Sequence, residues 1–109
     1  MKRLIPLVAA IAALSGCVTL RAEHALTGKP RPAYSGEVKI VMEGAPTTGQ
    51  VDEIAVVNAI GAGQDSSLPV ILKALQNEAA SLGCNAVIRV RYDQGTRQAS
   101  ATGVAAWVE

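Results

Sequence analysis

The sequence is poor in aromatic side chains and in residues suited to catalysis or metal binding. It has no Phe, two Tyr, one Trp (Trp107), one His (His24) and two Cys (Cys17 and Cys84). Without Phe, the core has to be built from Val, Ile, Leu and Ala, whose individual burial energies are modest. We therefore expect a marginally stable small domain that relies on a partner or on self-association as a homo-oligomer.

The scarcity of His and Cys also argues against several kinds of chemistry. No CxxC or HxxxH spacing is present, so the sequence predicts no metal site. A catalytic nucleophile needs an adjacent base, and the single His lies in a segment that we expect to be a linker. We predict no catalytic residue and no cofactor-binding residue, and hence a protein that is not an enzyme.

The charge balance carries no signature of nucleic-acid binding. Removing Lys2 and Arg3 from the ten basic residues leaves eight against nine acidic residues, with no basic patch. Because nucleic-acid binding depends on clustered positive charge, we expect no nucleic-acid partner.

The N-terminus has the features of an export signal. Lys2 and Arg3 precede an uncharged apolar run from Leu4 to Leu14, which is shorter than the ~20 residues that a membrane-spanning helix needs. A positive start, a short apolar run and small residues after it are typical of a signal that is removed. Residues 1–16 are therefore predicted to be a signal peptide.

The four residues Leu14-Ser15-Gly16-Cys17 resemble the lipobox of bacterial lipoproteins. The resemblance implies cleavage before Cys17, a lipid on its thiol and acylation of the new N-terminus. The lipid would attach the protein to a membrane. Val18 is not Asp, which implies the outer membrane, with the domain facing the periplasm or the cell surface. The alternative is an ordinary secretory signal in which the cysteine occurs by chance.

Residues 17–36 are predicted to be the lipidated N-terminus and a flexible tether, and residues 37–109 a single small domain. The tether prediction depends on Gly28, Pro30, Pro32 and Gly36 and on the few large apolar side chains around them. His24 falls in this segment and is expected to be a solvated linker residue.

The pattern of residues 37–109 predicts an α+β domain in the order β-β-α-β-β. Apolar residues with helical spacing predict one helix over residues 66–82, with Ser66 or Ser67 as its cap and Gly83 as its left-handed end. Alternating apolar residues predict strands over 37–43, 52–60, 85–92 and 100–108. We expect the helix to pack on one face of a mostly antiparallel sheet.

Several polar residues have both a functional and a structural interpretation. Four acidic residues have two interpretations: Glu37, Glu43, Asp52 and Glu53. In one, members of this set pair across strands as a catalytic acid and base. In the other, which we favour, they are solvated charges. The loop 61–66 superficially resembles a phosphate cradle, but it lacks the Lys and the glycine spacing, which favours a capping loop.

Two further groups of residues belong to the strand predicted over 85–92 and to the turn before it. Alternation puts Ala86, Ile88, Val90 and Tyr92 on one face, and Val87, Arg89 and Arg91 on the other. The two arginines bind an anion in one interpretation and simply keep the surface soluble in the other, which is our default. Cys84 is a redox thiol or, as we favour, a buried packing residue.

The segment from Glu78 to Val87, EAASLGCNAV, resembles a helix–strand junction in the YbjQ-like domains and the RcsF-like outer-membrane lipoproteins. The resemblance extends back over residues 52–82, and Cys84 stands where these families usually have Ala. It implies the fold and, for YbjQ-like domains, self-association. RcsF-like proteins have paired cysteines, and Cys84 has no partner once Cys17 is lipidated. In the junction itself, Asn85 is expected to bond local backbone.

Together these features predict a lipid-anchored cell-envelope protein without enzymatic activity. Its expected role is protein–protein interaction in envelope sensing, signalling or structural support. The alternative is a lipidated small-ligand or metal-binding module of YbjQ-like type.

Overall fold

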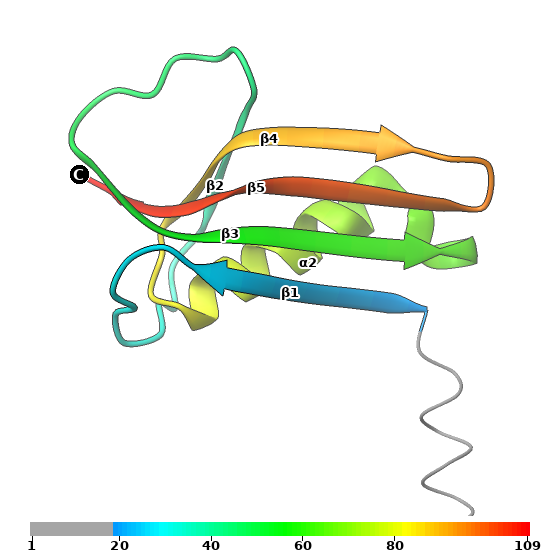
Figure 1. Ribbon diagram of the computed structural model, residues 1–109, viewed down its shortest axis with the longest axis horizontal. Coiled ribbons are helices and arrows are strands. Elements are labelled where there is room, and N and C mark those ends of the chain that lie inside the picture. The colour runs from blue at the N-terminus through cyan, green and yellow to red at the C-terminus, as the bar shows by residue number, and fades with distance from the viewer. Residues whose placement is uncertain (1–18) are drawn as a thin grey trace, which may run out of the picture.

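The computed structural model describes residues 19–109, which form one helix packed on a five-stranded mixed sheet (Figure 1). The elements are β1 (Leu20–Leu26), β2 (Lys39–Met42), β3 (Val51–Ala62), η1 (Gly63–Ser66), α2 (Leu68–Ser81), β4 (Ala86–Gln94) and β5 (Gln98–Val108). The strand order is β1-β3-β5-β4-β2. All neighbours are antiparallel except β2 and β4, which are parallel. The predicted α+β class is confirmed, and no helix among residues 19–109 is long and apolar enough to cross a bilayer.

The first strand corrects the prediction of a flexible tether. Leu20–Leu26 form β1, which pairs with β3 along its whole length. The chain that follows is also fixed, because Arg31 and Tyr34 donate backbone hydrogen bonds to the carbonyls of Leu82 and Ala80 at the end of α2. The tether prediction was therefore wrong for residues 20–34. Cys17 and the predicted signal peptide lie outside the described residues.

The helix forms as its periodicity predicts, within two residues at its start and one at its end. Ile71, Ala74, Leu75 and Ala79 are buried against the sheet. At its end, Cys84 N–H donates to Ala79 O and Gly83 N–H donates to Ala80 O, while Gly83 has φ +82°. These two bonds are those of a Schellman motif, which satisfies the last helical carbonyls.

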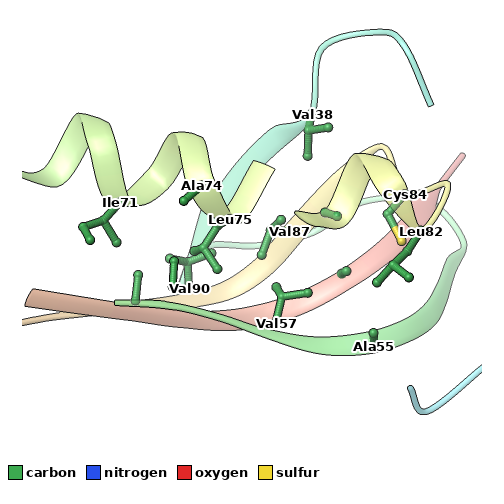
Figure 2. Close-up of a cluster of buried hydrophobic side chains, with 14 of the residues drawn as sticks. Val38, Ala55, Val57, Ile71, Ala74, Leu75, Leu82, Cys84, Val87 and Val90 are labelled. Atoms are coloured by element: carbon green, nitrogen blue, oxygen red, sulfur yellow. The ribbon is translucent and has the colours of Figure 1, made fainter. Parts of the chain in front are cut away.

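The core lies between α2 and the sheet and is made of small and branched aliphatic residues (Figure 2). In β3, Ala55 and Val57 lie beneath the helix, and Ala101 and Ala105 of β5 belong to the same cluster. Gly103 lies between the two alanines, where a Cβ would come within 2.6 Å of Val87 Cγ1. Small residues in the central strands thus let the helix and β4 pack closely without aromatic side chains.

The alternation predicted for β4 is interrupted by a bulge. Arg89 has φ +53°, and the register with β5 shifts between Ile88 and Arg91. Val87 and Val90 consequently both join the core beneath the helix, whereas Ala86 and Ile88 belong to a second cluster. The predicted grouping of Ala86, Ile88 and Val90 on one face was wrong, because a bulge adds a residue and changes which side chains face the core.

Candidate functional site

A groove lies between β1 and α2. Its volume is about 560 Å³. Leu20 and Ala22 line it from the strand, and Pro69, Val70 and Ala74 line it from the helix. The lining is mainly aliphatic, so it provides an apolar contact surface rather than a site for charge chemistry.

Polar side chains at the groove join the strand to the helix. The Nδ1 atom of His24 lies 2.6 Å from Glu78 Oε2, and Glu78 lines the groove. His24 was expected to be a solvated linker residue, and the structure instead places it in β1 with a partner on α2. Its role here is structural, because it holds the edge strand against the helix. Among residues 19–109, no three His, Cys, Asp or Glu side chains are arranged to hold a metal ion.

Beside the groove, β1 has a free edge. Among residues 19–109 it is the terminal strand of the sheet and pairs with β3 alone. Ala62 N–H donates to Thr19 O at 2.9 Å, and Thr27 N–H donates to Ile54 O at 2.8 Å. Because antiparallel bonds alternate, the backbone groups of Arg21, Glu23 and Ala25 point toward β3. Those of Leu20, Ala22, His24 and Leu26 consequently point outward and can pair with another strand.

The acidic residues singled out in the sequence pair with arginines on the surface. Glu53 lies 2.8 Å from Arg89, Glu43 lies 3.6 Å from Arg91, and Asp52 lies 3.6 Å from Arg31. Each of these side chains is at least 40% exposed, so each pair contributes little to stability. Glu37 is exposed. Glu43, Asp52 and Glu53 each pair with a different arginine, which supports the interpretation as solvated surface charges.

Cys84, whose N–H makes one of the two Schellman bonds, is buried in the core (Figure 2). Burial raises the pKa of its thiol to about 11, an effect that Arg31 opposes and Asp52 reinforces. Because the thiolate is the reactive form, a buried thiol with a raised pKa is inert near neutral pH. The interpretation of Cys84 as a packing residue is confirmed.

An aromatic cluster that sequence reasoning missed fixes the segment after β1. The Arg31 guanidinium carbon lies 4.8 Å from the centre of the Trp107 ring, which also meets Tyr34 edge-on at 5.6 Å between centroids. The only Trp and one of two Tyr in the chain meet here. The only signal in the sequence was the small number of aromatic side chains, which is three in the whole chain. The cluster attaches residues 31–34 to β5.

The loop 61–66 joins β3 to α2. Its first two residues end β3, and the rest form η1. Ser66 Oγ donates to Gly63 O, and Asp65 accepts a hydrogen bond from the Thr19 hydroxyl. Ser67 occupies the N-cap position of α2, but its side chain makes no cap hydrogen bond. The prediction that a serine side chain caps the first turn was therefore wrong.

Asn85 bonds backbone as expected, but not in its own turn. Its side-chain amide donates to Val108 O and accepts from Val108 N–H, both at 2.8 Å. Asn85 thereby joins the start of β4 to the end of β5. Its role is to extend the sheet pairing by one position.

Comparisons with known proteins found no match: no family model, no curated protein and no solved structure corresponds to this chain.

Proposed function

We propose that this chain is a lipid-anchored protein of the bacterial cell envelope, attached to the outer membrane through Cys17 and acting by protein–protein interaction. The lipobox-like residues Leu14 to Cys17 carry the anchor part of the proposal. The resemblance of residues 78–87 to YbjQ-like and RcsF-like proteins belongs to the same proposal. The motif in these residues has a physical explanation, which supports the resemblance. A left-handed Gly and small residues allow a helix to pass directly into a closely packed strand.

The single structural observation that supports an interaction role is the free edge of β1. A seven-residue edge strand with outward backbone groups can accept a further strand, which gives affinity through main-chain hydrogen bonds. Natural sheets commonly protect such an edge with proline, a bulge, a short strand or charged side chains, and of these features β1 has only the charged Arg21 and Glu23. β1 contains no Pro and pairs with β3 without a register shift. Its outer edge is therefore suited to a partner strand.

The membrane assignment is tested by separating inner and outer membranes of a Gram-negative host that expresses the native chain. We expect the native protein in the outer membrane. Cys17→Ser removes the acceptor thiol and should leave an unprocessed or soluble form. Val18→Asp keeps the thiol but supplies an inner-membrane retention residue, and should move the protein to the inner membrane of an enterobacterial host. A native protein that is soluble in the periplasm would contradict the proposal.

The interaction role is tested by placing a photoreactive residue at Glu23 in β1 and, as a matched control, at Glu43 after β2. Both positions are exposed glutamates. We expect a discrete crosslinked envelope protein, or a crosslinked second copy, from the β1 position only. The crosslink should be indifferent to chelators, which distinguishes this role from the metal-binding alternative. Equal, diffuse crosslinking from both positions would contradict the proposal.

A further inference from the structure

We infer that the lipidated protein stands with one end of its sheet directly against the bilayer, rather than on a flexible spacer. The inference rests on the lipidation of Cys17 proposed above. It concerns the proximal end, defined here as Thr19, η1, the first turn of α2 and the β4–β5 turn (residues 95–97). The opposite, distal end contains the loop 43–50 and Glu109.

The first step is the short distance between the anchor and the folded domain. Thr19 O accepts a hydrogen bond from Ala62 N–H at 2.9 Å, and the Thr19 hydroxyl bonds Asp65 in η1. The fold therefore includes Thr19, only two positions after Cys17. Two residues span at most about 7 Å. A lipid on Cys17 consequently keeps the proximal end within contact distance of the membrane surface.

The second step is the direction of the strands. β1 begins, and β3 ends, at the same end of the sheet as the β4–β5 turn, whereas the C-terminus and the loop 43–50 lie at the other end (Figure 1). The twelve residues of β3 span about 40 Å at the usual rise per residue. When the proximal end touches the bilayer and the strands stand upright, the distal end is about that far from it.

The third step is the chemistry of the proximal end. Leu68 is 41% exposed at the start of α2, and it is followed by the exposed Pro69. The β1–α2 groove begins beside them, lined by Leu20 and Val70 and also by Lys73. Lys73 has no ion-pair partner among residues 19–109. Exposed aliphatic side chains beside a long cationic one suit the headgroup boundary, where the lysine stem lies along apolar surface and its ammonium reaches lipid phosphate.

This arrangement determines what the protein presents to its surroundings. The free edge of β1 runs away from the membrane, so a partner strand can approach it from the side. The Arg31–Trp107 cluster and the loop 43–50 lie at the distal end, away from the lipid.

The test places a fluorophore at each end of the full-length lipidated protein. Thr96→Cys labels the β4–β5 turn and Thr47→Cys labels the distal loop, and both threonines are exposed. Cys84 stays native, because it is buried and its thiol is not reactive. Each protein is purified from membranes, checked by intact mass, labelled, and reconstituted in phosphatidylethanolamine–phosphatidylglycerol vesicles with or without nitroxide headgroup lipids.

We expect the nitroxide lipids to remove fluorescence from Thr96→Cys and to leave Thr47→Cys bright. Inserting about ten Gly and Ser residues between positions 18 and 19 should restore the Thr96→Cys signal, because a flexible spacer lets the domain leave the surface. Equal quenching at both positions in lipidated protein would overturn the upright arrangement and leave the lipid anchor intact. A mass without acyl chains, with fluorophore on Cys17, would overturn the proposed function as well.

Discussion

Cys84 shows how one residue can have a reactive side chain and a purely structural role. It is fully buried, and burial raises the pKa of its thiol from 9.0 to about 11. The unfolded chain therefore releases this proton at lower pH than the folded protein. Between pH 9 and about 11 the unfolded state binds fewer protons, so the free energy of unfolding falls as pH rises.

The first prediction concerns this pH dependence. In a Cys17→Ser background, where Cys84 is the single thiol, we expect stability from this group to be complete below pH 9 and lost as pH rises through about 11. Cys84→Ala should remove that component, which is of the order of 2–3 kcal/mol for a shift of this size. Urea unfolding at pH 8 and at about pH 11 measures this difference in the free energy of unfolding. An identical pH dependence in the two proteins would contradict the burial of the thiol.

Gly83 links the end of the helix to the segment after β1. Its φ is +82°, and a Cβ at this position would lie 2.6 Å from Arg31 O. Gly44 has a similar φ of +90°, but a Cβ there would meet nothing within 4 Å. The two glycines thus separate the cost of a left-handed backbone from the cost of a steric clash.

The second prediction uses this pair. Gly44→Ala should cost about 1 kcal/mol, since only backbone strain opposes it. Gly83→Ala should cost more, by about 1–3 kcal/mol in addition, because Arg31 has to move. Urea unfolding of both variants gives the difference. Equal losses would show that residues 27–36 do not pack on the helix end and would restore the tether interpretation.

At the scale of elements, β1 is the strand that the sequence did not predict. Its sequence, LRAEHAL, contains no β-branched or aromatic residue, and Ala, Leu and Glu favour helices. It is a strand because β3 offers it a complete register from Leu20 to Leu26. Pairing over a long distance in the chain overrides local preference here.

The third prediction tests the direction of the β1 backbone groups. Ala25 N–H points toward β3, so Ala25→Pro removes a sheet bond and should destabilise the domain by about 2–3 kcal/mol. Ala22 N–H points outward, so Ala22→Pro should cost about 1 kcal/mol or less while blocking strand addition. Thermal unfolding measures the first effect, and loss of the crosslink from Glu23 measures the second. The opposite order of stabilities would show that the register is wrong.

Other elements could be predicted because their signals are local. The helix follows from the spacing of Ile71, Leu75 and their neighbours, and its end follows from Gly83. The bulge at Arg89 leaves no trace in the alternation of apolar residues, and the cluster of Arg31 with Trp107 joins positions far apart in the chain. The candidate groove was missed for the same reason as β1, which forms one of its walls.

At the scale of the whole molecule, the lipid proposed on Cys17 would be attached two positions before Thr19, which already belongs to the folded domain. A tether would leave the domain free to orient, whereas β1 joins the anchor to the sheet itself. If Cys17 carries the proposed lipid, the orientation of the sheet and the exposure of the distal end follow from that attachment, whereas the free edge of β1 follows from the strand order. All of this depends on the proposed lipid on Cys17.

The most direct measurement is the intact mass of the native protein extracted from membranes of a Gram-negative host, beside the Cys17→Ser protein. We expect a chain that begins at Cys17, with its mass raised by three acyl chains, and an unmodified chain for Cys17→Ser. A native chain without acyl chains, or one in which Cys17 remains a free thiol, would contradict it.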